Sequence, residues 1–273
     1  MKWQNILIRL RKLMGILMSN RSPKQVALKN SFWLFLAHGV SKVFKFFLVI
    51  FAARILGPEG YGGFNYTVSI LTLLFTASEL GVEQVLIREY QKADVDKAKL
   101  LATTFVMKMG LIIGSGLLAL GYAQFSSDAL VGQIFFVLLA MVIVDSIKLF
   151  LVSIVRANNR MEFESGAFIA ETVFTTVFGL MALFYTQSIF YFACAYLAGS
   201  SIAFLLILPA VGRFFSLKNI WGSVDVRYGL LLLGIGIPLM ISNIARTFMS
   251  TTDMVLIKWF LDHKEVGYYS ASL

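Results

Sequence analysis

The sequence has few of the residues that soluble proteins place on their surfaces. Only 14% of its 273 residues are charged, whereas 58% are hydrophobic. Soluble domains carry about 25% charged residues on average, so this composition excludes a soluble globular protein. The longest polar stretches, residues 88–99, 156–165 and 213–227, are also too short to form a soluble domain.

Cysteine and histidine are nearly absent. The single cysteine, Cys194, excludes an internal disulfide and any metal site built on two cysteines. It lies in a run of small residues, 193–203, and we interpret it as a structural thiol. The two histidines, His38 and His263, are far apart in the expected topology, which argues against a histidine metal site. We expect no metal ion and no cofactor.

Catalytic motifs are also missing. The chain has no nucleophile motif and no glycine-rich phosphate loop. Asp94-Val-Asp96 has the spacing with which some glycosyltransferases hold a metal and a nucleotide. It lies in a short loop among lysines, however, and we interpret it as a solvated loop or a helix N-terminus. We therefore expect that the protein is not an enzyme.

Long apolar segments dominate the rest of the chain. Each is long enough to cross a hydrocarbon core of ~30 Å, which takes about 20 helical residues. The sequence thus predicts an all-α, polytopic membrane helical bundle. Seven such segments occur, at residues 30–53, 63–87, 99–122, 130–155, 166–186, 188–211 and 228–257.

Lysine and arginine alternate between the connections of these segments. The N-terminal tail and every second loop together hold sixteen, and the other loops hold only three, Arg54, Lys258 and Lys264. This is the positive-inside pattern, and it predicts a cytoplasmic N-terminus. Because most of the net charge of +9 lies at these helix ends, we expect membrane lipids, not nucleic acid, as its partner.

The first 29 residues do not resemble a signal peptide, since Arg9, Arg11 and Lys12 interrupt the apolar stretch. Apolar residues instead recur at helical spacing, from Trp3 to Leu17. This pattern predicts an amphipathic helix in the cytoplasmic interface, with a disordered basic tail as the alternative.

The chain shows a weak internal repeat. Leu56-Gly-Pro-Glu-Gly-Tyr-Gly62-Gly-Phe64 follows the first span, and Leu261-Asp-His-Lys-Glu-Val-Gly267-Tyr-Tyr269 follows the seventh. In both, a glycine stands six residues after a leucine and an aromatic residue two further on, at an offset of 205 residues. Duplicated six-helix halves are a common transporter architecture.

Several of these motifs resemble one transporter family. Residues 53–62, Ala-Arg-Ile-Leu-Gly-Pro-Glu-Gly-Tyr-Gly, look like the motif that follows the first span of the oligosaccharide flippases, the Wzx-type branch of the MATE-like MOP superfamily. Glu79-Leu-Gly-Val82, Ile237-Pro238 and Val266-Gly-Tyr-Tyr-Ser-Ala271 are similar to further family features. The resemblance covers essentially the whole chain.

The resemblance implies a domain organisation. Family members have two six-helix lobes, and this chain departs from them by lacking nearly all of the second. We expect a cytoplasmic amphipathic segment at 1–29, an N-terminal six-helix lobe at 30–212, a cytoplasmic inter-lobe linker at 213–227 and the first helix of an incomplete second lobe at 228–273. Such a chain would not transport by itself.

Charged residues within the spans are the main functional signal, because charges at membrane depth are costly. His38, Lys42 and Lys45 share one face of the first span, and Lys42 lies ~18 Å deep at ~1.5 Å per residue. Arg246 and Asp253 share a face of the seventh span. We predict that Lys42, Lys45 and Arg246 bind substrate. His38, Asp253, Glu79, Glu83, Lys108, Asp145 and Lys148 are candidates for lining the cavity or coupling transport, or for structural ion pairs.

A cationic cavity suits an anionic cargo. The resemblance implies a polyprenyl-diphosphate-linked oligosaccharide, flipped to the outer leaflet of the inner membrane by alternating access for O-antigen, capsule or exopolysaccharide assembly. A polysaccharide polymerase and export machinery are then candidate partners. Two alternatives remain: a MATE-like multidrug or cation exporter, which should have an acidic cavity, and a membrane-embedded glycosyltransferase or ligase, which should have a long outer loop.

Overall fold

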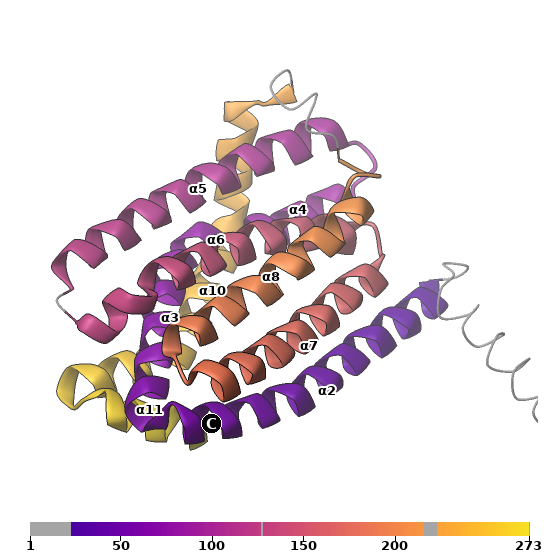
Figure 1. Ribbon diagram of the computed structural model, residues 1–273. Coiled ribbons are helices and arrows are strands. Elements are labelled where there is room, and N and C mark those ends of the chain that lie inside the picture. Colours follow the sequence, from indigo (N-terminus) through magenta and orange to yellow (C-terminus); the bar gives the residue numbers. More distant parts are fainter. Residues whose placement is uncertain (1–22, 127, 216–222, 273) are drawn as a thin grey trace, which may run out of the picture.

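The computed structural model describes residues 23–126, 128–215 and 223–272, and this part of the chain folds into helices without strands (Figure 1). The all-α prediction is therefore confirmed. Six of the described helices are long and apolar enough to cross a membrane: α2, α5, α6, α7, α8 and α10. The helices are α2 (Pro23–Ile55), α3 (Gly57–Glu79), α4 (Val82–Tyr90), α5 (Lys97–Phe125), α6 (Ala129–Ala157), α7 (Met161–Thr186), α8 (Ile189–Val211), α10 (Val226–Phe260) and α11 (His263–Ser272).

The second predicted span, residues 63–87, is not one helix in the structure. It is divided between α3 and α4. The break falls at Leu80 and Gly81, where Gly81 has a φ of +70°. A Cβ on Gly81 would lie 2.9 Å from the carbonyl oxygen of Gly236 in α10. Glycine thus permits both the left-handed backbone and the close approach of α10. Hydropathy runs on through the break and does not reveal it.

Short polar side chains begin several helices. Asp96 accepts hydrogen bonds from the backbone nitrogens of Ala98 and Lys99 at 3.0 and 3.2 Å, and so caps α5. The second aspartate of the Asp94-Val-Asp96 motif is therefore a helix cap. Asp225 caps α10 in the same way and pairs with Lys99 at 2.6 Å. The hydrogen bond from Lys99 lowers the pKa of the Asp225 carboxyl from its usual value.

Helices α2 to α8 form a bundle of inclined, side-by-side rods (Figure 1). Helix α7 packs between α2 and α8, and α8 packs on α6. Two apolar clusters fill the bundle. One surrounds Leu48, Phe64 and Phe192 at the end near the α2–α3 connection, and the other surrounds Leu86, Phe150 and Ile207 near the opposite end.

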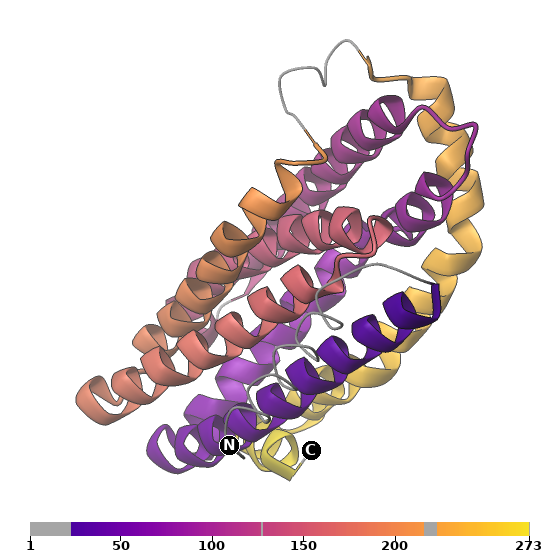
Figure 2. The ribbon, with the colours of Figure 1, turned by 90° about the vertical axis from the view of Figure 1, so that its right-hand side faces the viewer.

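Helices α10 and α11 lie against one side of this bundle (Figure 2). Helix α10 contacts α3, α4 and α5, and α11 packs on α3. We call the end that carries the α2–α3, α5–α6, α7–α8 and α10–α11 connections the outer end, and the opposite end the inner end. Helix α2 begins seven residues before the predicted span, and the rest of the predicted amphipathic helix lies outside the described residues.

Candidate functional site

A cavity of about 240 Å³ separates α10 from the inner half of the bundle. We call it the central cavity. Three sets of side chains line it: Glu79, Glu83, Gln84 and Ile87 from α3 and α4, Leu149, Val152, Ser153 and Arg156 from α6, and Asn243, Arg246 and Thr247 from α10. The cavity thus lies where the bundle faces α10. We call α10 and α11 the repeated segment, because the sequence predicts that they repeat the first span and the motif after it.

A second cavity of about 180 Å³ shares a wall with the first. Leu149, Val152 and Arg156 line both, so the two cavities adjoin along the inner half of α6. Its other wall comes from α2 and α7, with His38, Phe168 and Glu171 among the lining residues. Polar side chains of α2, α6, α7 and α10 therefore line two adjoining cavities.

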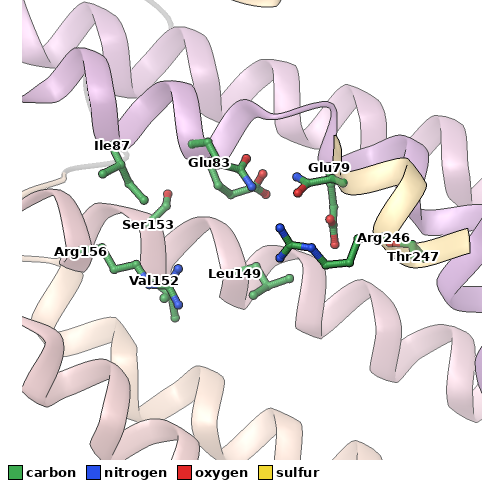
Figure 3. A pocket seen from close by; sticks show the side chains of 11 residues that line it. Glu79, Glu83, Ile87, Leu149, Val152, Ser153, Arg156, Arg246 and Thr247 are labelled. Carbon is green, nitrogen blue, oxygen red and sulfur yellow. The ribbon is translucent and has the colours of Figure 1, made fainter. Parts of the chain in front are cut away.

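The central cavity contains charges of both signs. The side chains of Arg246 and Glu79 project into it from α10 and α3 (Figure 3). The carboxylate of Glu83 is 2.6 Å from Nζ of Lys108, whose side chain is fully buried and also donates to the carbonyl oxygen of Ser78 at 3.1 Å. Lys108 pairs with Glu83, and Nε of Arg156 donates to Glu164 of α7 at 2.8 Å, so Arg246 and Glu79 remain as opposite charges on the walls of the cavity.

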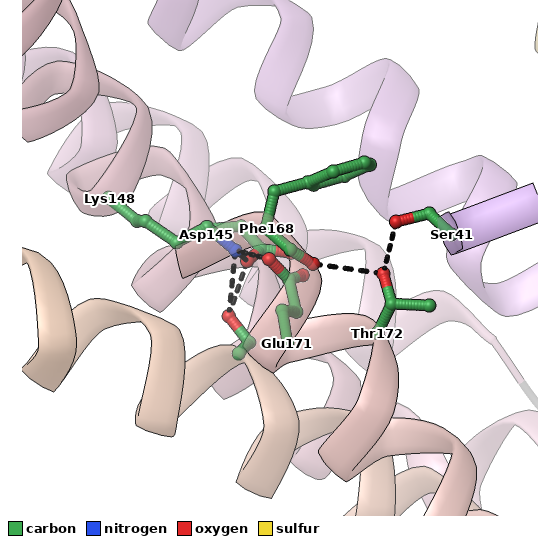
Figure 4. A network of polar contacts seen from close by, with 7 residues as sticks. Ser41, Asp145, Lys148, Phe168, Glu171 and Thr172 are labelled. Atoms are coloured by element: carbon green, nitrogen blue, oxygen red, sulfur yellow. Dashed lines mark hydrogen bonds and ion pairs between the residues drawn. The ribbon is translucent and has the colours of Figure 1, made fainter. Parts of the chain in front are cut away.

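Behind the second cavity lies a buried ionic network that joins α6, α7 and α8 (Figure 4). Nζ of Lys148 lies 2.5 Å from Asp145, 2.7 Å from Glu171 and 3.4 Å from the hydroxyl of Ser200, which itself donates to Asp145. One ammonium therefore holds two carboxylates. Asp145 and Lys148, three residues apart, were already candidates for structural ion pairs from the sequence. Their partners Glu171 on α7 and Ser200 on α8 could not be predicted, because these contacts depend on how the helices pack.

Lys42, Lys45 and Arg246 are all exposed, but they differ in the cavities that they line. Lys42 is exposed and lines neither cavity, whereas His38 lines the second one and packs edge-on against Phe168 at 5.2 Å between ring centroids. Nζ of Lys45 lies 6.0 Å from the centroid of Phe168 and borders a small cavity beside Glu171. The cavity of Lys45 thus adjoins the second cavity, with which it shares Phe168 and Glu171, and it shares no lining residue with the central cavity of Arg246.

Asp253 lies apart from this region. It is exposed on α10 and accepts a hydrogen bond from the hydroxyl of Tyr269 at 2.8 Å, which ties α10 to α11. Its contact is therefore local to the repeated segment, whereas Glu79, Glu83 and Arg246 line the central cavity.

Sequence reasoning missed five polar residues that line the central cavity: Gln84, Ser153, Arg156, Asn243 and Thr247. Arg156 appeared only as a charge at the end of a span. Asn243 and Thr247 are uncharged, yet they stand 205 residues after His38 and Lys42. The repeat offset itself could have identified them, because it maps the polar face of α2 onto α10.

Comparison with protein families gives one assignment. The model of a family described as "Polysaccharide biosynthesis protein" matches residues 27–272. Searches of curated proteins and of solved structures find no match. The family match covers almost the whole chain, and the long apolar helices agree with its membrane character. This chain therefore belongs to the polysaccharide biosynthesis protein family, as a multi-pass membrane protein of its flippase-type transporter class.

Proposed function

We propose that this protein takes part in flipping a polyprenyl-diphosphate-linked oligosaccharide from the cytoplasmic to the outer leaflet of the inner membrane. The observation that carries the proposal is Arg246, which lies in the middle part of α10 and projects into the central cavity, whose α6 wall includes Arg156 near the inner end. A diphosphate is anionic and strongly hydrated, and it needs such cations to enter the membrane interior. The polyprenyl chain would remain in the lipid.

Arginine suits this role because its planar guanidinium can hold two phosphate oxygens at once. Arg246 comes from α10 and Arg156 from α6, so a bound diphosphate would connect the bundle to α10, with Arg156 leaving its ion pair with Glu164 to do so. Lys42 and Lys45, on the neighbouring face of α2, would contact the cargo as it enters. Lysine acts there as a point charge on a flexible stem.

The carboxylates near these cations have separate roles in this proposal. Glu83 is already paired with Lys108, and Asp145 and Glu171 are paired with Lys148. Glu79 would compete with the cargo for Arg246, so that the cavity is not left with an uncompensated cation when it is empty. The pair of Glu83 with Lys108 and the network of Lys148 with Asp145 and Glu171 would then mainly hold helices together.

The proposed orientation follows the charge pattern, with the inner end and the N-terminus in the cytoplasm. The central cavity lies in the inner half of the molecule and would accept cargo from that side. Alternating access would then require the outer end to open. A polysaccharide polymerase and export machinery would receive the flipped product.

One observation favours a different cargo. Glu79 and Glu83 both line the central cavity, and carboxylates are typical of sites for cationic drugs. A MATE-like exporter is therefore the second candidate. The pairs Lys108–Glu83 and Arg156–Glu164 leave no excess charge of either sign, so the preference for a lipid-linked oligosaccharide over a cationic drug rests on the family match.

The test is export of polymer in a strain whose own flippase is deleted, with each variant made in a protein that also carries the second six-helix lobe expected from the family resemblance. We expect Arg246→Gln to abolish export and Arg246→Lys to retain part of it, at unchanged protein level. Arg54→Gln, which removes an exposed arginine at the outer end of α2, serves as the matched control. Normal export by Arg246→Gln would overturn the proposal. Drug resistance conferred by the protein and lost in Glu79→Gln would support the exporter instead.

A further inference from the structure

A cluster of charged groups joins the bundle to the repeated segment at the outer end. Nε2 of His263, the first residue of α11, lies 2.6 Å from Oδ2 of Asp128, the N-cap of α6. Nζ of Lys258, near the end of α10, lies 3.4 Å from the same oxygen. One carboxylate of the bundle therefore binds two basic groups of α10 and α11.

This contact is shielded from water. The His263 side chain is 8% exposed, and its ring lies edge-on to Tyr66 of α3 at 5.5 Å between centroids. The hydroxyl of Tyr66 is 3.2 Å from that of Tyr122 in α5, so aromatic groups of two helices border the cluster. Ion pairs are stronger when partly buried than in open solvent.

The same end holds a second polar contact between these parts. Nδ2 of Asn65 in α3 donates to the hydroxyl of Ser270 in α11 at 3.3 Å. Deeper along α3, the buried hydroxyl of Ser69 contacts the sulfur of Met254 in α10 at 3.2 Å. The outer end is therefore closed by α10 and α11, while both cavities lie in the inner half.

We propose that Asp128, His263 and Lys258 form an ionic latch that holds the outer end closed and must separate before cargo can leave on that side. The proposal rests on the proposed function, because it assigns the latch to one state of the transport cycle. Asp128 is the shared partner, so its charge sets the strength of the latch. Burial of the Asp128 carboxyl raises its pKa. The hydrogen bond and charge of His263, together with the charge of Lys258, outweigh burial, so the pKa lies below its usual value.

Thiol labelling from outside measures whether this end is open. Ser69→Cys, in a background with Cys194→Ala, places a probe on the buried face of α3 beneath the latch. A membrane-impermeant methanethiosulfonate should label it slowly in whole cells. We expect Asp128→Asn or His263→Gln to raise the labelling rate about tenfold, as the loss of one charge-assisted hydrogen bond implies.

Asp128→Asn keeps the side-chain oxygen that caps α6 at Leu130, so it removes charge without removing the cap. Asp96→Asn makes the same change at the cap of α5, at the inner end, and should leave labelling unchanged. The exchange of partners, Asp128→His with His263→Asp, should return the rate toward that of the parent. This rescue would not follow from a general loosening of the fold.

Unchanged labelling in both Asp128→Asn and His263→Gln, at normal protein levels, would overturn the latch. So would equal acceleration by Asp96→Asn. Labelling does not depend on the cargo, so faster labelling in a protein that fails to export polymer would support the latch while refuting the proposed function.

Discussion

Gly62 and Gly267 stand 205 residues apart and meet where α3 crosses α11. A Cβ on Gly62 would lie 1.8 Å from the carbonyl oxygen of His263, and a Cβ on Gly267 would lie 1.9 Å from that of Pro58. Pro58 and His263 are themselves separated by 205 residues. Each glycine therefore packs against the backbone four residues before the other glycine, as in a contact around a twofold axis.

Other features keep the same offset. Helix α2 ends at Ile55 and α10 at Phe260, and the hydrogen-bonded residues Asn65 and Ser270 also differ by 205. We propose that α10 and α11 repeat α2 and α3, and that the two copies meet around a local pseudo-twofold axis at the outer end. The short leucine–glycine–aromatic pattern in the sequence then records the backbone contact that each copy makes.

This reciprocity predicts matched effects of the two glycines. Gly62→Ala and Gly267→Ala should each separate α3 from α11, because the added methyl would overlap a carbonyl group. Overpacking of this kind typically costs about 1–3 kcal/mol. Crosslinking of Asn65→Cys to Ser270→Cys should fall in both, by a similar factor.

Gly114→Ala in α5 is the control, since a Cβ there meets nothing within 4 Å. The double alanine variant should be little worse than either single one, because one contact is lost in all three. Normal crosslinking in Gly62→Ala would contradict the close crossing.

A second prediction concerns the buried pair of Lys108 and Glu83. Lys108→Met should destabilise the protein by about 3–5 kcal/mol, because Glu83 would remain buried without its partner. Adding Glu83→Gln should recover much of this loss. Thermal unfolding of the purified protein in detergent measures both effects.

Lys99→Met is the matched control, because the side chains of Lys99 and its partner Asp225 are 40% and 36% exposed. Its unfolding temperature should change little, as expected for an exposed ion pair. If Lys108→Met unfolded at the temperature of the parent, the pair would not have the structural role assigned to it here.

Sequence reasoning predicted the helical spans well, because each long apolar segment must become a helix to satisfy its backbone in lipid. It missed the break at Gly81, which depends on how closely α10 approaches. Depth along a helix indicated that Lys42 and Arg246 are charges placed unusually deep in the membrane. It could not show that Arg246 lines the central cavity and that Lys42 does not. That distinction depends on which neighbouring helix covers each face.

A third prediction concerns pH and the latch. Because the pKa of Asp128 is lowered in the folded protein, its contribution to stability is present above the ordinary value of about 3.9 and is lost as pH falls through the lowered value. The groups that face Asp128 are His263, Lys258 and Tyr66. The unfolding temperature of the parent should therefore exceed that of Asp128→Asn at pH 7, and only acidification below about pH 4 should remove the difference by protonating this carboxyl.

The fourth prediction is the orientation in the membrane. Sixteen basic residues in the N-terminal tail and every second connection of the sequence, against three in the other connections, predict that the inner end faces the cytoplasm. Gln124 near the end of α5 and Ala93 in the α4–α5 connection are both exposed and lie at opposite ends of the bundle. In a Cys194→Ala background, an impermeant thiol reagent added to whole cells should modify Gln124→Cys and spare Ala93→Cys.

Permeabilised cells supply the control, since both cysteines should then react. Neither substitution removes a charge, so the distribution that sets the topology is preserved. Labelling of Ala93→Cys but not of Gln124→Cys in intact cells would show that the orientation is opposite to the predicted one. The central cavity would then face outward, and cargo could not enter it from the cytoplasm in the conformation described.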